Sequence, residues 1–192
     1  MNVQEATTRR LPDLKERHLP ENCRETINTI LKETYGYEQF RNLEIYDDLS
    51  KGKEKLCISQ GQLIENVILE AEKAWKSETQ VDNILLTAPT GSGKSLLFQL
   101  PAIYLGKEYN LLTIVVSPLK ALIVDQVESL QELGYARVAY ASSDLSPEQK
   151  MEVYRQVREG EIDLFYLSPE LLLSYDIKHF VGERRIGLVG GR

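Results

Sequence analysis

The sequence predicts an α/β fold in which a doubly wound parallel sheet carries helices on both faces. Apolar runs of five or six residues alternate with helical stretches of ten to fifteen residues, as in successive β-α-β units. The runs are apolar throughout, which is typical of strands buried on both faces. A content of 42% hydrophobic and 27% charged residues is sufficient for the core of a soluble globular domain.

Five apolar runs are expected to form the strands. They are NILLTA, LLTIVV, RVAYA, IDLFYL and RRIGLV, at residues 83–88, 111–116, 137–141, 162–167 and 184–189. Each run is too short for an ordinary helix. Ligands of such folds bind beyond the carboxyl ends of the strands, so the residues that follow each run are the candidate functional residues.

Helices are expected before and between these strands. The predicted spans are 21–34, a helix that begins at residue 60 and reaches residue 75, and 94–105, 118–133 and 147–159. Ile27, Ile30 and Leu31 share one face of the first helix. Ser146 and Gln149 form a capping box at the start of the last one. Glycines 36, 106, 134 and 160 are expected to end four of these helices.

Composition and charge restrict the domain organisation and the location of the protein. The charged stretch DDLSKGKEK favours a boundary, with a helical N-terminal extension over 1–54 and the α/β domain over 55–192. The net charge of −6 gives no overall indication of a nucleic-acid partner, although a local basic strip is compatible with it. No leader peptide and no bilayer-spanning run are evident, so we expect a cytoplasmic protein with no membrane partner. Cys23 and Cys57 are expected to be free thiols.

The stretch APTGSGKS, at residues 88–95, predicts a phosphate-binding loop. It follows an apolar run and opens a helix, which is the context that a Walker A loop requires. Glycines let backbone N–H groups approach phosphate oxygens, and the N-terminus of the helix adds a partial positive charge. A glycine-rich turn that only joins a strand to a helix is the alternative. The nucleotide-binding residues predicted here are Pro89, Thr90, Gly91, Ser92, Gly93, Lys94 and Ser95.

Four stretches in order resemble motifs of superfamily 2 DEAD/DEAH-box helicases of the RecQ-like branch. APTGSGKSLLFQLPAIYL resembles motif I, with alanine at residue 88 where the strict pattern has glycine. VVSPLKALIVDQVESL resembles motif Ia, the stretch from ASSDLSPEQK to FYLSPELLL resembles the region through motif Ib, and SQGQLIENVIL resembles the Q-motif helix. The resemblance covers about residues 60–189 and implies a RecA-like P-loop NTPase domain.

The resemblance also implies ligands. It implies ATP and Mg²⁺ as cofactors, with Lys94 on the β- and γ-phosphates and Ser95 on the metal ion. It makes Gln60 the residue that recognises adenine, with Gln62 as a rival. The family carries an aromatic residue and an arginine just before that glutamine, whereas here the pair in QFR, at residues 39–41, lies well upstream.

The same resemblance implies a nucleic-acid partner, single-stranded or partly duplex, and its RecQ-like motifs favour DNA over RNA. Motifs Ia and Ib of this class hold the backbone of one strand, and small hydroxyl donors at strand ends suit phosphate oxygens. For each serine taken alone, a helix cap is an equal alternative. The predicted nucleic-acid-binding residues are Ser117, Lys120, Ser142, Ser143 and Ser168.

One element of the family pattern is missing. A DExH carboxylate follows the strand that corresponds to RRIGLV, whereas here GGR follows. Asp125 has helical neighbours, Asp163 lies at the wrong end of its strand, and Glu170 is a weak substitute. We therefore expect the front part of a helicase motor, without the second RecA-like domain, which binds ATP and hydrolyses it inefficiently.

Three other functions are compatible with the loop. A P-loop kinase would need an arginine-rich lid, for which Arg155, Arg158, Arg184 and Arg185 are the candidates. A non-hydrolysing, ATP-gated nucleic-acid-binding module would explain the missing carboxylate. A structural α/β domain with a vestigial loop is the third possibility.

Overall fold

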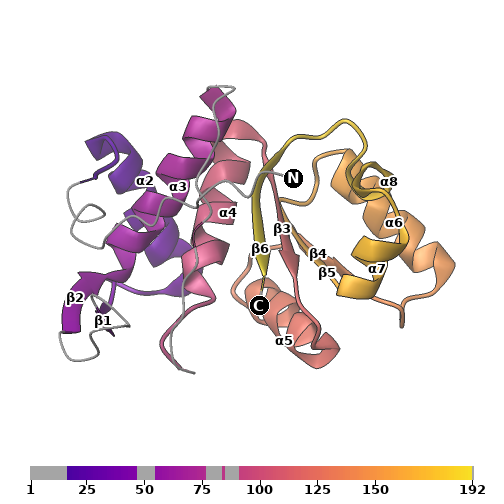
Figure 1. Ribbon diagram of the computed structural model, residues 1–192, viewed down its shortest axis with the longest axis horizontal. Coiled ribbons are helices and arrows are strands. Elements are labelled where there is room, and N and C mark those ends of the chain that lie inside the picture. Colours follow the sequence, from indigo (N-terminus) through magenta and orange to yellow (C-terminus); the bar gives the residue numbers. More distant parts are fainter. Residues whose placement is uncertain (1–16, 47–54, 77–83, 85–90, 192) are drawn as a thin grey trace, which may run out of the picture. The chain divides into compact units, whose positions relative to one another are not determined.

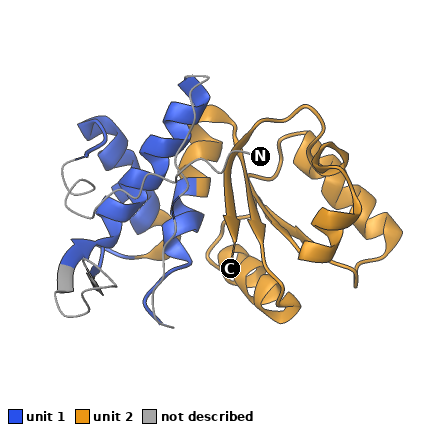
Figure 2. Cartoon of the chain, viewed as in Figure 1, with its two compact units in different colours: residues 1–32, 37–101 blue, residues 33–36, 102–192 orange. Residues whose placement is uncertain are grey.

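The computed structural model describes residues 17–46, 55–76, 84 and 91–191. The chain forms two compact units, one with residues 1–32 and 37–101 and the other with residues 33–36 and 102–192 (Figure 2). The predicted boundary at residue 54 and the predicted strand at 83–88 fall on residues outside the described ones, except for Ile84. Within the described parts, no helix combines the length and apolar character needed to cross a bilayer.

The first unit contains helices and a two-stranded sheet (Figure 1). Its elements are most of α2 (Glu21–Tyr35), β1 (Asn42–Tyr46), β2 (Lys55–Ser59), α3 (Gln60–Lys76) and the first part of α4 (Leu96–Tyr109). The predicted face of α2 is confirmed, because Ile27, Ile30 and Leu31 are buried. Helix α3 starts at the predicted residue and buries Ile64 and Ile68 completely. Both helices thus form where the spacing of apolar residues predicts them.

Strands β1 and β2 form an antiparallel hairpin that the sequence analysis missed. Asn42 pairs with Ser59 at its base and Tyr46 with Lys55 at its far end. The charged stretch between them was interpreted as a domain boundary, yet two five-residue runs flank it, NLEIY and KLCIS. Short runs on either side of a turn-rich segment are a hairpin signal. The hairpin returns the chain to its starting point, so that residue 60 lies beside residue 41.

The second unit contains a four-stranded parallel sheet. Its strands are β3 (Leu112–Val116), β4 (Val138–Ala141), β5 (Leu164–Leu167) and β6 (Ile186–Gly191), in the order β4-β5-β3-β6. All pairings are parallel. Four of the five predicted strands are therefore confirmed, and the predicted α/β class with them.

Helices cover both faces of this sheet (Figure 1). They are α5 (Lys120–Glu132), which packs against β4, and α6 (Pro147–Arg158), α7 (Pro169–Ser174) and α8 (Ile177–Val181). One face carries a core in which Ile114, Phe165 and Leu167 of the sheet meet Tyr154 of α6 and Phe180 of α8. The neighbouring strand residues, such as Val115 and Tyr166, are also buried and point to the opposite face.

Two details of the helix ends test the sequence rules. The capping box of α6 is confirmed: the Ser146 hydroxyl accepts a hydrogen bond from the Gln149 N–H at 3.2 Å, and the Gln149 side chain accepts one from the Ser146 N–H at 2.9 Å. Gly106 was expected to end α4, and this prediction is wrong. The helix continues to Tyr109 and ends at Asn110, which takes a left-handed φ of 52°. Gly106 is needed for packing, because a Cβ there would lie 2.3 Å from the Asp163 carboxyl carbon.

Candidate functional site

The described part of the phosphate loop, Gly91 to Ser95, leads directly into α4. Gly91 and Gly93 adopt φ values of 82° and 76°, a left-handed conformation that favours glycine. The Gly93 and Lys94 carbonyls accept hydrogen bonds from the first helical N–H groups, at 3.2 and 3.0 Å. Within the described residues, no group accepts a hydrogen bond from the Gly91, Ser92 or Gly93 N–H. This arrangement suits an anion at the helix N-terminus. Pro89 and Thr90 lie outside the described residues.

Gln60 joins this loop to the base of the hairpin. Its side-chain Nε2 donates a hydrogen bond to the Ser92 carbonyl at 3.1 Å and lies 3.5 Å from the Gly93 carbonyl. Its Oε1 accepts a hydrogen bond from the Arg41 N–H at 3.2 Å. The residue is only 2% exposed. A Cβ at Gly93 would lie 2.5 Å from Gln60 Nε2, so the close contact depends on glycine at that position.

The hairpin brings Arg41 to Gln60 although 18 residues separate them in the sequence. The Gln60 N–H donates to the Arg41 carbonyl at 2.8 Å, which closes a two-way link with the bond described above. The Arg41 guanidinium lies 5.9 Å from the centre of the Tyr37 ring, a cation–π distance. Both side chains are exposed. Arg41, the basic residue of QFR, therefore lies beside Gln60 although it is far upstream in the sequence, and the aromatic Phe40 packs against the next residue, Gly61. Tyr37 had not been identified as a candidate.

Gln62, the rival of Gln60, takes another role. Its side-chain amide donates a hydrogen bond to the Arg17 carbonyl at 2.7 Å, which ties the segment before α2 to α3. The Arg17 guanidinium also pairs with Glu70 of α3 at 2.7 Å. Gln60 thus contacts the described part of the loop, whereas Gln62 holds the segment before α2.

The second unit carries the predicted nucleic-acid-binding residues at the carboxyl ends of its strands. Ser117 follows β3, Ser142 follows β4 and Ser168 follows β5, so the topology gathers all three along one edge of the sheet. Their side chains are buried, with exposed fractions of 3%, 3% and 1%. The Oγ atoms of Ser117 and Ser168 have no hydrogen-bond partner among the described residues. Ser168 precedes α7 without a side-chain capping bond. Because these three hydroxyls are buried, they can contact a phosphate directly only if the residues that cover this edge of the sheet move away.

The exposed members of this set are Ser143 and Lys120. Lys120 Nζ forms an ion pair with the Asp144 carboxylate at 2.7 Å, and both side chains are well exposed. The Ser143 carbonyl lies 3.5 Å from Lys150 Nζ. The positive charge that the sequence places at this edge is thus compensated by an acidic neighbour.

The carboxylates considered for catalysis lie elsewhere. Asp163 is at the amino end of β5, opposite to the serine edge, as predicted. Its buried carboxylate accepts hydrogen bonds from Arg137, at 2.6 and 2.8 Å, from Arg184 at 3.0 Å and from the Tyr135 hydroxyl at 3.0 Å. Burial, together with the Asp163 charge, raises the pKa of Tyr135. Asp125 is exposed on α5, and Glu170 is exposed in the first turn of α7.

Three of the four arginines that a kinase lid would use are engaged in structural contacts. Arg155 pairs with Glu152, Glu159 and Glu161 on the surface of α6. Arg184 is buried in the cluster around Asp163. Arg158 donates a hydrogen bond to the His179 carbonyl at 3.0 Å. The described residues therefore offer no support for an arginine lid.

Comparison with known proteins gives consistent findings. The family model for the DEAD/DEAH box helicase matches residues 68–188. The ATP-dependent DNA helicase RecQ of Synechocystis sp. is 32% identical over 167 residues, covering 87% of this chain and 28% of that protein. RecQ of Bacillus subtilis is 32% identical over 148 residues, covering 77% of this chain and 20% of that protein. The ATP-dependent DNA helicase Q-like 5 of Arabidopsis thaliana is 32% identical over 152 residues, covering 79% and 13%. The chain thus spans less than a third of the length of these relatives.

Proposed function

The chain belongs to the DEAD/DEAH box helicase family, with a RecQ-like sequence, and we propose that it is the ATP-binding part of an ATP-dependent DNA helicase or translocase. The observation that carries the proposal is the link from Gln60 to the phosphate loop at Ser92. It joins the place where a triphosphate would lie to the place where a base would lie. Coupling of ATP binding to movement on single-stranded DNA is the function of the whole motor in this proposal.

Nucleotide binding would use both parts of the first unit. The backbone of Gly91–Gly93 would hold phosphate oxygens, Lys94 would neutralise the β- and γ-phosphates and Ser95 would bind Mg²⁺. The adenine ring would lie against Tyr37 and Arg41. A glutamine amide offers two donors and two acceptor lone pairs. Among the described residues, Gln60 Nε2 contacts the Ser92 and Gly93 carbonyls and Oε1 accepts one hydrogen bond, so an acceptor lone pair would be available to a base.

A binding assay with a fluorescent ATP analogue tests the phosphate site. We expect Lys94→Ala to weaken magnesium-dependent binding by at least about tenfold, since it removes charge-assisted hydrogen bonds. Lys107→Ala removes the same charge from an exposed position on α4 and serves as the control. Equal affinities for the two variants would contradict the proposal.

The base site is tested separately. Gln60→Ala is expected to reduce the preference for ATP over GTP, and Gln62→Ala to leave that preference unchanged. Thermal unfolding of both variants controls for a loss of folding, because Gln60 is buried. A loss of preference in Gln62→Ala alone would transfer the role to that residue.

For hydrolysis, we propose that the 192-residue chain turns ATP over negligibly. Strand β6 ends in Gly190 and Gly191, which supply no carboxylate to orient Mg²⁺ or water. This feature favours a second candidate function for the chain, an ATP-gated module that binds nucleic acid without hydrolysis. Single-stranded DNA affinity, measured with and without ATP, detects the gating. Steady DNA-stimulated turnover that Lys94→Ala abolishes would exclude the module and support a complete catalytic site.

A further inference from the structure

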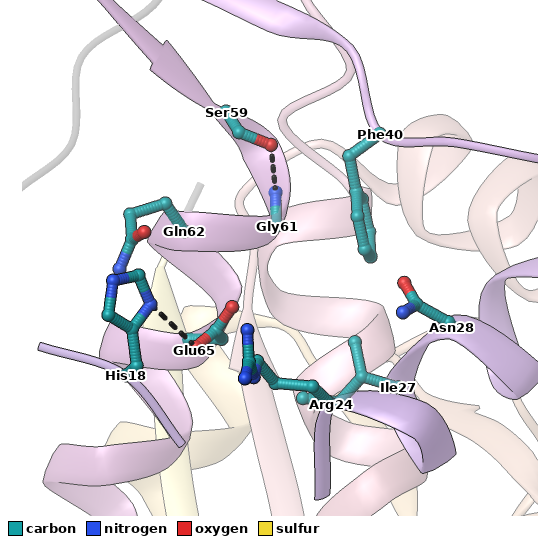
Figure 3. Close-up of a pocket in the computed structure, with 9 residues that line it drawn as sticks. All are labelled: His18, Arg24, Ile27, Asn28, Phe40, Ser59, Gly61, Gln62 and Glu65. Atoms are coloured by element: carbon teal, nitrogen blue, oxygen red, sulfur yellow. Dashed lines mark hydrogen bonds and ion pairs between the residues drawn. The ribbon is translucent and has the colours of Figure 1, made fainter. Parts of the chain in front are cut away.

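A cavity of about 310 Å³ lies within the first unit, between α2 and the beginning of α3 (Figure 3). Arg24 and Asn28 line it from α2, Glu65 lines it from α3, and Phe40 and His18 complete its wall. Gln62 also lines the cavity, whereas Gln60 and Gly91–Ser95 are not among the described lining residues. The cavity therefore lies on other side chains than the loop contact of Gln60, and its size is at the lower end of the range for small-molecule sites.

The polar groups on the α3 side of the cavity are already satisfied. The Glu65 carboxylate accepts a hydrogen bond from the Leu19 N–H at 3.0 Å and pairs with His18 at 3.5 Å. The Ser59 hydroxyl accepts a hydrogen bond from the Gly61 N–H at 3.1 Å (Figure 3). These contacts hold that wall in place through Glu65 Oε2 and Ser59 Oγ.

The α2 side differs, because its donors are not used. Arg24 and Asn28 are four residues apart in α2 and therefore share one face of the helix. Within the described residues, neither the Arg24 guanidinium nor the Asn28 side-chain amide has a hydrogen-bond or ion-pair partner. Together they offer a fork of guanidinium donors and an amide donor, which matches a carboxylate.

The remaining wall is flat and apolar. The Phe40 ring packs directly on Gly61, where an added Cβ would lie 2.6 Å from Phe40 Cδ2. Glycine at this position therefore lets the ring lie close to the start of α3. Ile27, which is 2% exposed, forms the floor beside Arg24. A planar ring is the shape that such a wall accommodates.

We propose that this cavity binds a small planar aromatic carboxylate, with its ring beside Phe40 and its carboxylate on Arg24 and Asn28. The negative charge of Glu65 favours a carboxylate over a phosphate as the bound anion. One negative charge already lies in the cavity, so a monoanionic carboxylate meets less repulsion than a dianionic phosphate. The inference does not depend on the proposed motor function.

Isothermal titration of the full chain with 2-naphthoate tests the proposal, with 2-naphthamide as the neutral analogue and 2-naphthyl phosphate as the dianion. We expect 2-naphthoate to bind with a Kd of roughly 1 mM or tighter, as its size allows. Arg24→Gln should weaken it by at least about tenfold and Asn28→Ala by about threefold. Lys32→Gln removes a positive charge from the same helix outside the cavity and should have no effect.

Each outcome of the titration bears on the assignment. Loss of binding in Arg24→Gln with retention in Lys32→Gln supports it. Absence of 2-naphthoate binding to the unchanged chain overturns it, as does equal binding of the amide. Tighter binding of the phosphate overturns the choice of a carboxylate. Displacement of 2-naphthoate by ATP would mean that the cavity belongs to the nucleotide site, whereas failure of ATP to bind leaves the carboxylate site unaffected.

Discussion

The two ends of the parallel sheet in the second unit are built on opposite principles. At the amino ends of β5 and β6, the buried Asp163 is held by Arg137, Arg184 and Tyr135. At the carboxyl ends, small hydroxyl side chains follow the strands, and the ion pair of Lys120 with Asp144 is exposed. The charges of Asp163 and Arg184 are thus buried at one end, whereas those of Lys120 and Asp144 are accessible to water at the other.

This difference assigns the stability of the sheet to its amino end and the capacity for ligand binding to its carboxyl end. A buried charge that loses its partners costs several kcal/mol, whereas an exposed ion pair contributes little. The amino end can therefore anchor the sheet, and the carboxyl end can change its contacts without loss of the fold. Ligand sites of such sheets lie at the carboxyl end, where that freedom is useful.

The largest expected effect comes from removing the Asp163 carboxylate at the amino end of the sheet. Asp163→Ala leaves the Arg184 guanidinium buried, since the side chain is 5% exposed, and removes the acceptor of four hydrogen bonds. We expect a loss of about 3–5 kcal/mol in the free energy of unfolding, measured by urea denaturation. Asp144→Ala is the matched control at the other end, where no measurable change is expected. Similar losses for both variants would refute the contrast between the ends.

A smaller effect is expected from two glycines of the same strand. A Cβ at Gly187 would lie 2.9 Å from Leu111, whereas a Cβ at Gly190 would meet Val115 at 3.7 Å, an ordinary contact. Gly187→Ala should therefore destabilise the unit by about 1–3 kcal/mol through overpacking. Gly190→Ala should be neutral within about 0.5 kcal/mol. Thermal unfolding of both variants makes the comparison, and a larger loss for Gly190→Ala would contradict it.

The carboxyl end offers a third test, which depends on the proposed DNA partner. Asp144→Ala releases Lys120 from its ion pair, so we expect affinity for single-stranded DNA to rise about two- to fivefold at low salt. Fluorescence anisotropy with a labelled oligonucleotide measures the change. Asp125→Ala removes an equal charge from an exposed site on α5 and controls for net charge. An equal gain in both variants would assign the effect to overall charge.

The architecture was predictable because its signals are local. Periodicity fixed the spans of α2, α5 and α6, and apolar runs marked the described strands of the sheet. The prediction for Gly106 failed because the rule that glycine ends a helix considers only the neighbouring residues. Asp163 is more than fifty residues away in the sequence, and it packs so closely on residue 106 that only glycine fits there.

The candidate site was predictable in part. The loop and Gln60 were identified from the sequence, but the pairing of Arg41 with Gln60 was not, because it depends on the β1–β2 hairpin. Ser117, Ser142 and Ser168 lie at strand ends as predicted, but their burial was not predicted, because it depends on tertiary packing. Sequence patterns thus located the backbone of the site better than the exposure of its side chains.

The smallest expected effect concerns the exposed ion pair itself. A hydrogen bond from Lys120 lowers the pKa of Asp144 below its usual value of 3.8. Lys120→Ala should therefore raise the pKa of Asp144 toward that value, which an NMR titration of its side-chain carboxyl can follow. A carboxylate whose pKa is lower in the folded than in the unfolded state stabilises the fold at pH values above its unfolded pKa. This stabilisation is lost as the pH falls through the pKa of the folded state. The part of any unfolding difference between Lys120→Ala and the unchanged chain that comes from this ion pair should then decrease as the pH falls through the lowered pKa of Asp144. Lys178→Ala, on the exposed surface of α8, should leave the Asp144 titration unchanged. A pKa of Asp144 that stays low without Lys120 would show that other groups at the carboxyl end hold its charge.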